Sequence, residues 1–87
     1  MTKFDNTDIF NKAEYNREFI KLTLDNVIDI IESKGYDPVS QLMGYIKTEN
    51  PVYIPRYNGA REKIIKIPTE DLLEYLIHYF VNNRNFD

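Results

Sequence analysis

Apolar residues recur at spacings of three and four along much of this chain, which is the pattern of amphipathic helices. Between residues 17 and 34 one such stripe is formed by Ile20, Leu24, Val27, Ile28 and Ile31. Gly35 follows the stripe, and glycine suits the left-handed position that ends many helices because it has no Cβ. We therefore predict a helix that starts near residue 17 and closes at Gly35.

A shorter helix is predicted to begin at Asp37-Pro38. Asp37 can cap the free N–H groups of the first turn, and proline is favoured at the first helical position. The expected inner face of this helix is Val39, Leu42, Met43 and Ile46. Gly44 is either a helix end or a point of close contact.

The segment from Thr48 to Arg56 contains Pro51 and Pro55, and each proline disfavours helical geometry in the residue before it. We expect an extended loop here, with Val52 and Ile54 as its apolar contacts.

Two more helices are predicted after the turn at Asn58-Gly59. The first has an apolar side and a solvent side and stops at Pro68, with Ala60, Ile64 and Ile67 inward and Glu62, Lys63 and Lys66 outward. Thr69 is expected to cap the last helix, whose core stripe is predicted to be Leu72, Leu73, Leu76, Ile77 and Phe80. The fold class is therefore all-α, a small compact bundle of about four helices.

The predicted domain organisation has three parts. Residues 1–16 lack a sustained period and are expected to be a flexible tail, residues 17–83 form the helical domain, and residues 84–87 form a frayed end. With 87 residues and no cysteine, the core is thin, which favours a homodimer. Tyr75 and Tyr79 flank the main stripe of the last helix and are the expected dimer contact.

Charge separates the possible partners. The net charge is −3, which argues against a protein that coats nucleic acid. Yet Arg56, Arg61, Lys63 and Lys66 stand against Glu62 alone in one short segment. Proline-stiffened arginines suit recognition of carboxylate or phosphate, although salt bridges to the acidic helices explain them equally well.

An alternative reading makes this segment a small nucleic-acid-binding module. Tyr53, Tyr57 and the basic residues between Tyr53 and Lys66 would then supply stacking and phosphate contacts. A steep salt dependence of binding would distinguish this module from a protein-binding one.

No catalytic constellation is evident from the sequence. His78 is the single histidine and falls on the polar side of the last helix, where a solvated residue is expected. We therefore expect no enzyme activity, no metal, no cofactor and no membrane insertion, in a soluble cytoplasmic protein.

Two blocks of sequence carry a family resemblance. The blocks are KGYDPVSQLMGY (residues 34–45) and PVYIPRYNGAR (residues 51–61), and they resemble the IreB family, whose spacing between the two blocks they match without a gap. That resemblance implies a helical homodimer without catalytic activity, which acts as a phosphorylation-controlled regulator of cell-envelope synthesis. It also implies that Arg56 and Arg61 contribute to the regulatory output, and we add Lys63 and Tyr53 to that candidate surface.

The resemblance extends to the N-terminus, where Phe4 and Phe10 flank Thr7 as in the family's phosphorylated tail. Thr7 is therefore the expected acceptor for a membrane Ser/Thr kinase with PASTA repeats, opposed by a cognate phosphatase. In the family, the unphosphorylated form is implicated in Clp-dependent removal of the UDP-N-acetylglucosamine enolpyruvyl transferase of peptidoglycan synthesis. Asp8 and Ile9 depart from the family pattern just after the acceptor.

Overall fold

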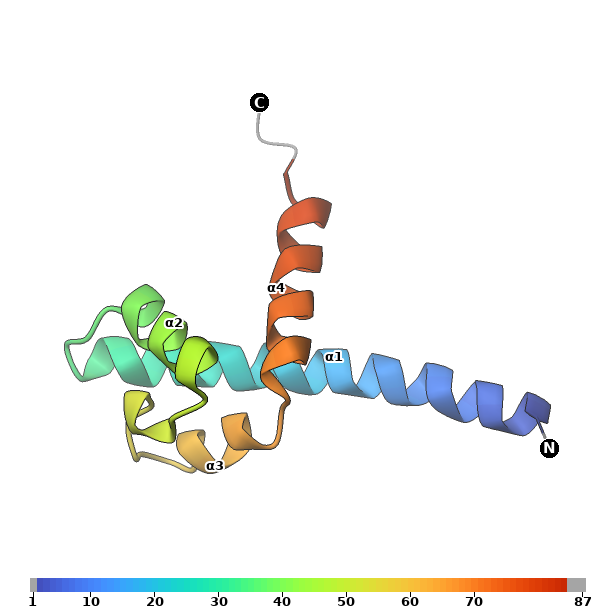
Figure 1. Cartoon of the computed structure of the whole chain (residues 1–87), viewed down its shortest axis with the longest axis horizontal. Helices are drawn as coiled ribbons and strands as arrows, with labels where there is room; N and C mark the ends of the chain where they lie inside the picture. Colours follow the sequence, from blue (N-terminus) through green and yellow to red (C-terminus); the bar gives the residue numbers. More distant parts are fainter. Residues whose placement is uncertain (1, 85–87) are drawn as a thin grey trace.

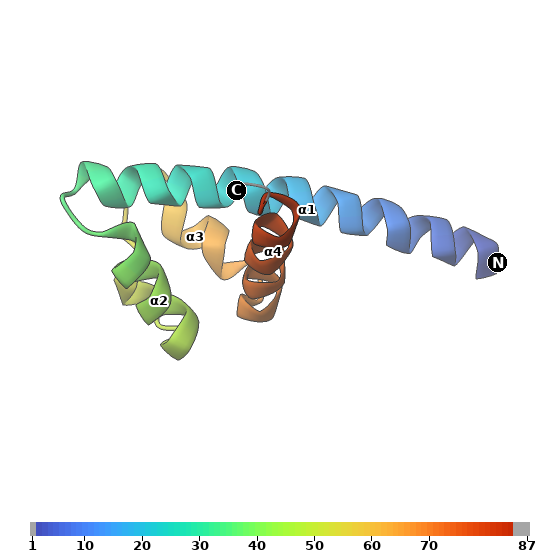
Figure 2. The ribbon, with the colours of Figure 1, turned by 90° about the horizontal axis from the view of Figure 1, so that it is seen from above.

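The computed structural model describes the backbone of residues 2–84 and the side chains of residues 17–84, and this part of the chain contains helices and no strands. The elements are α1 (Thr2–Ser33), α2 (Pro38–Thr48), the 3-10 helix η1 (Pro51–Tyr53), α3 (Ala60–Ile65) and α4 (Thr69–Asn82). In Figure 1, α2 and α3 gather against the C-terminal half of α1, while α4 crosses α1 and projects away. Figure 2 shows these three helices on one side of α1. The predicted all-α fold is confirmed.

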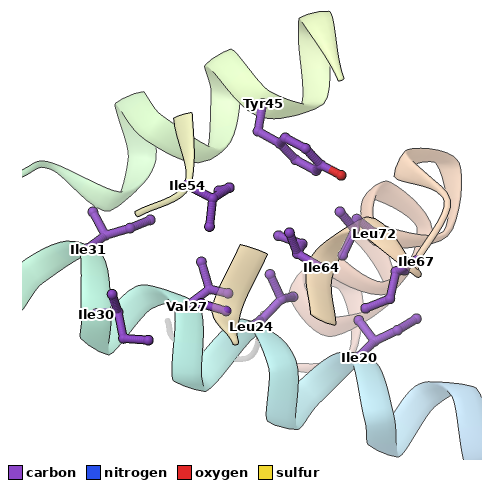
Figure 3. Packing of buried hydrophobic residues seen from close by; sticks show 11 residues of the cluster. Ile20, Leu24, Val27, Ile30, Ile31, Tyr45, Ile54, Ile64, Ile67 and Leu72 are labelled. Carbon is purple, nitrogen blue, oxygen red and sulfur yellow. The ribbon is translucent and has the colours of Figure 1, made fainter. Parts of the chain in front are cut away.

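The core lies between the C-terminal half of α1 and the three shorter helices (Figure 3). From α1 it takes the predicted stripe, with Ile30 added and Ile28 only partly buried. From α3 it takes Ala60 and Ile64, and from the turn that follows α3 it takes Ile67, which are the three predicted positions. Apart from Ile28, each of these side chains is at most 6% exposed, so the helical period found in the sequence identifies the inward side of α1 and of the segment from Ala60 to Ile67.

The turn between α1 and α2 has the predicted chemistry. Gly35 has φ +85°, and the N–H of Tyr36 donates to the carbonyl of Ile31 as the helix ends. Asp37 is extended and its Oδ2 accepts from the N–H of Ser40 at 2.9 Å, with Pro38 at the start of the helix. The predicted cap and helix start are confirmed.

The inner face of α2 is different from the one predicted. Tyr45 is its buried residue, whereas Val39 is 68% and Met43 is 52% exposed. Leu42 and Ile46 are only partly buried. The structure places Tyr45 and Gly44 toward η1 and the core because η1 packs along that side, an arrangement the period alone did not indicate.

The proline segment combines extended residues with a helical turn. Asn50 and Ile54 are extended as predicted, yet the residues between them form η1. Ile54 is fully buried, while Val52 is 65% exposed. The expected pair of apolar contacts is thus reduced to Ile54.

The last helix α4 does not bury its predicted core stripe. Leu72 is fully buried, but Leu73, Leu76, Ile77 and Phe80 are 38–62% exposed. The reason is geometric: α4 crosses α1 and leaves the bundle, so only its first turns meet the core (Figure 1). We call these four residues the α4 stripe.

The cap of α4 also differs from the prediction. Pro68 occupies the N-cap position, and no side chain caps the helix. The Thr69 hydroxyl donates instead to Glu49 Oε2 at 3.1 Å. Glu49 ends α2 in a left-handed conformation with φ 58°, so this contact joins the end of α2 to the start of α4.

The two ends of the chain bear on the predicted domain organisation. The backbone of α1 is helical from Thr2, where the sequence indicated no sustained helix. The flexibility of residues 1–16 stays a prediction, because their side chains lie outside the described residues. The predicted frayed end at residues 84–87 lies outside them except for Arg84, which follows α4.

Candidate recognition surface

Arg61 is fixed to the backbone of the proline segment. It lies in the first turn of α3, half-buried, and its Nε donates to the carbonyl of Ile54 at 3.0 Å. Because Ile54 is fully buried, this bond anchors the base of the guanidinium group to the core. The terminal nitrogens of Arg61 are not used by that bond and remain available to a partner.

Arg56 lies two residues after Ile54 and is exposed. Within residues 17–84 the ion pairs are Lys21 with Asp25 and His78 with Glu74, so neither Arg56 nor Arg61 is paired to a carboxylate there. Of the two explanations left open by the sequence, salt bridges to the acidic helices therefore gain no support from the described side chains. Two unpaired arginines on a stiff segment are suited to carboxylate or phosphate recognition.

The rest of the basic segment surrounds these arginines. Lys63 on α3 and Lys66 at its C-terminal cap are exposed, as the sequence predicted. Lys34, from the end of α1, places its Nζ 4.7 Å from the ring centroid of Tyr57. This cation–π contact adds a further positive charge to the same end of the molecule and holds the loop before α3 against α1.

Tyr53, which the sequence placed in the same surface, serves as a packing residue. Its ring lies directly over Gly44, where a Cβ would come within 2.5 Å of Tyr53 Cε1. Its carbonyl accepts from Gln41 Nε2 at 2.9 Å. The close contact considered for Gly44 is thus present, and it fixes η1 on α2 rather than offering the ring to a partner.

The two candidate dimer tyrosines have different environments. Tyr75 is half-buried and packs against the core, while Tyr79 is 58% exposed. Their rings are stacked, with centroids 6.5 Å apart and planes inclined by 24°. They lie on the side of α4 that carries His78, whereas Leu73, Leu76, Ile77 and Phe80 are exposed on another side of this helix.

His78 is solvated, as the sequence predicted. Its side chain is 58% exposed, and its Nε2 lies 3.8 Å from Glu74 Oε2, one turn earlier. No group of three or more potential metal ligands occurs among the described residues.

Burial affects the ionisation of one core residue. The pKa of Tyr45 is raised above the ordinary tyrosine value, chiefly by desolvation and secondarily by the Glu49 carboxylate.

In the described part of the chain, no helix is both long enough and apolar enough to span a bilayer. Thr7, the expected phosphoacceptor, lies outside the described side chains.

The part of the chain that the structure describes is all-helical. It exposes a basic segment, an apolar helix stripe and two arginines without a carboxylate partner among residues 17–84. The chain belongs to the IreB family, since the family model described as IreB regulatory phosphoprotein matches residues 5–82. The match covers both sequence blocks and the Thr7 region. The resemblance found in the sequence is therefore confirmed, and membership supports a role as a regulatory phosphoprotein.

Proposed function

We propose that this protein is a non-enzymatic regulator of peptidoglycan synthesis whose activity is set by phosphorylation of Thr7. The observation that carries the proposal is the family match, which includes Thr7, Arg56 and Arg61. By the same resemblance, the unphosphorylated protein acts as an adaptor for Clp-dependent turnover of the UDP-N-acetylglucosamine enolpyruvyl transferase. A PASTA-type Ser/Thr kinase relieves this effect, and a cognate phosphatase restores it.

The arginine pair supplies the contact that this role needs. A regulator without catalysis acts through the surfaces it presents. Arg56 and Arg61 have no carboxylate partner among residues 17–84, and Arg61 is anchored by its Nε bond to the Ile54 carbonyl. In the proposed adaptor state, they bind carboxylates of the target. Because guanidinium donors are forked, they favour planar acceptors such as carboxylates. The contact is therefore directional as well as electrostatic.

Phosphorylation then acts by competition. A phosphate on Thr7 adds a charge of about −1.5 to −2 and three acceptor oxygens. The segment from Arg56 to Lys66 holds four basic residues against Glu62 alone, so it attracts that phosphate within the subunit or across the dimer. The docked tail masks the arginines from the target.

A homodimer is part of this proposal, and we place its contact on the α4 stripe. Four large apolar side chains remain exposed on one side of a helix that projects from the bundle. An apolar surface of this kind is commonly covered by another protein, and a second copy carries an identical, self-complementary stripe. Covering it supplies the burial that an 87-residue core lacks.

The first experiment tests the regulatory input. The purified protein and its Thr7→Ala variant are incubated with ATP and the catalytic domain of the PASTA-type kinase, and phosphate is located by intact-mass and peptide spectrometry. We expect one phosphate that is absent from Thr7→Ala and unaffected in the control Thr48→Ala. Phosphate that persists in Thr7→Ala would refute Thr7 as the regulated residue.

The second experiment tests the masking. In NMR spectra of the phosphorylated protein, we expect the tail to lose mobility and amides near Arg56 and Arg61 to shift. The double variant Arg56→Glu/Arg61→Glu should restore the tail's mobility. If it leaves the phosphorylated tail unchanged, the phosphate docks elsewhere and masking by this segment is wrong.

A further inference from the structure

A cleft lies where the start of the described part of α1 meets the end of α4. It has a volume of about 210 Å³ and is lined by Arg17, Tyr75, His78, Tyr79, Asn82 and Asn83. Arg17 comes from α1, and the other side chains come from α4 or the residue that follows it. Two elements that are far apart in the sequence therefore form its opposite walls.

The cleft occupies a different side of α4 from the α4 stripe. Its lining residues Tyr75, His78, Tyr79 and Asn82 are spaced at i, i+3, i+4 and i+7, so they share one helix face. The α4 stripe has the same spacing but is displaced by two residues, which rotates it by about 200° around the axis. A partner seated on the α4 stripe therefore leaves the cleft open.

The polar groups that line the cleft are mostly hydrogen-bond donors. Arg17 contributes a guanidinium group that has no carboxylate partner among residues 17–84, and Asn82 contributes a carboxamide. The two tyrosines add hydroxyls, and His78 adds an imidazole with a ring N–H donor. Asn83 is already fixed, because its Nδ2 donates to the carbonyl of Tyr79 at 2.7 Å.

The part of the cleft wall that residues 17–84 form carries no negative charge. None of the lining residues is acidic. A carboxylate oxygen of Glu74 lies 3.8 Å from His78 Nε2. On α1, Asp25 lies one turn after Lys21, and its carboxylate pairs with the Lys21 ammonium at 3.0 Å. The interior therefore favours an anion, whereas the acidic chain as a whole does not.

The volume limits the size of the ligand. Sites for drug-sized molecules measure about 300–1,000 Å³, so this cleft fits a single anionic group with a small organic part. The stacked rings of Tyr75 and Tyr79 form an apolar wall for that organic part. We propose that the cleft binds a small phosphate monoester, with the phosphate on Arg17, His78 and Asn82 and the organic group against Tyr79.

This site is separate from the arginine pair and would give the regulator a second input, a dissolved metabolite in addition to a kinase. Lys21, one turn after Arg17 on α1, is paired with Asp25 and is not part of the site. Its occupancy would tie α4 to α1 at the point where α4 leaves the bundle.

The test is a titration of the ¹⁵N-labelled full chain with phenyl phosphate, monitored by NMR. We expect saturable shifts of amides near residues 17–21 and 75–83, with a dissociation constant that rises roughly tenfold in Arg17→Gln, as loss of one charge-assisted contact implies. The matched control Arg56→Gln should bind as the wild type does. Circular dichroism establishes that both exposed substitutions leave the fold intact.

Two further probes identify the ligand chemistry. Inorganic phosphate should shift the same amides more weakly, and phenol should produce no saturable shift. The proposal is overturned if phenyl phosphate fails to saturate these amides, if phenol binds as well as phenyl phosphate, or if Arg56→Gln weakens binding as much as Arg17→Gln. The last result would place the phosphate on the basic segment instead.

Discussion

The ring of Tyr53 lies against Gly44 so closely that a methyl group at residue 44 would come within 2.5–2.9 Å of three ring atoms. The two residues belong to η1 and α2, and the Gln41 side chain reinforces the same junction through the carbonyl of Tyr53. This contact sets how near the proline segment lies to α2, and thereby where Ile54 and the following Arg56 are held.

We predict that Gly44→Ala destabilises the protein despite the better helix propensity of alanine. Overpacking costs about 1–3 kcal/mol, whereas alanine gains about 1 kcal/mol of helix propensity over glycine. The overpacking cost is larger if the Tyr53 ring cannot move away. The ring is held between Gly44 and the core, so we expect a net loss of about 1 kcal/mol in urea unfolding. Ser40→Ala on the exposed side of α2 is the control and should change stability by less than about 0.5 kcal/mol.

The double variant Gly44→Ala/Tyr53→Leu isolates the contact. Leucine gives the new methyl group room, so the second substitution should cost less in the Gly44→Ala background than in the wild type. Equal costs in the two backgrounds would show that the glycine and the ring do not constrain each other.

The two arginines should differ in how much they contribute to the free energy of unfolding. Arg61→Lys keeps the charge but loses the Nε bond to the Ile54 carbonyl, which should lower the free energy of unfolding by about 0.5–1.5 kcal/mol. Arg56→Lys removes no bond to the described residues and should change stability by less than about 0.5 kcal/mol. Unfolding in urea measures both, and a larger loss for Arg56→Lys would contradict the structural role given to Arg61.

Alkaline pH should weaken the fold through Tyr45. Burial raises the pKa of this phenol, so the folded state favours its neutral form. Its contribution to stability is complete below the ordinary tyrosine pKa of 10.0 and is lost as the pH rises through the higher folded-state value.

The measurement is the free energy of unfolding between about pH 8 and pH 11.5, the range that brackets ordinary tyrosine titration. Tyr45→Phe should reduce the alkaline fall, whereas Tyr36→Phe, at a position that is 57% exposed, should leave it unchanged. An identical pH profile for wild type and Tyr45→Phe would mean that Tyr45 is not the responsible group.

The α4 stripe should control self-association. Ile77 is 62% exposed, and a buried isoleucine contributes about 1.5–3 kcal/mol, so Ile77→Glu should weaken a dimer by roughly tenfold to 100-fold. Sedimentation equilibrium should then show a mass near the monomer's 10.4 kDa at concentrations where the wild type has about twice that mass.

Two controls locate the contact. Leu22→Glu introduces the same charge at a position on α1 that is 57% exposed and should leave the mass unchanged. Tyr79→Ser tests the tyrosine contact expected from the sequence. If Tyr79→Ser dissociates the dimer and Ile77→Glu does not, the interface lies on the side of α4 that carries Tyr79.

Local chemistry accounts for the parts of the fold that the sequence predicted well. The left-handed Gly35, the Asp37 cap and the inward side of α3 each depend on neighbouring residues in the chain. The family assignment likewise depends on contiguous blocks. These features need no knowledge of what lies across the core.

Most of the wrong predictions concern contacts between distant elements, although the cap of α4 and the turn at η1 are local exceptions. The period of α4 marks an apolar side, but it cannot say that the helix leaves the bundle after Leu72. Val39 and Met43 fit the spacing of a core face, yet η1 packs on the other side of α2. The α1–α4 cleft was missed for the same reason, since Arg17 and Asn82 are brought together only by the crossing of two helices.

The contact between Glu49 and Thr69 links the end of α2 to the start of α4. Glu49 adopts a left-handed conformation that ordinary residues disfavour, and its carboxylate takes the hydroxyl of Thr69 at the root of α4. Since α4 is fourteen residues long, a small rotation at its N-terminus moves its C-terminal end by several ångströms. In the proposed dimer, the angle between the two α4 helices would therefore depend on a glutamate and a threonine that need not contact the partner.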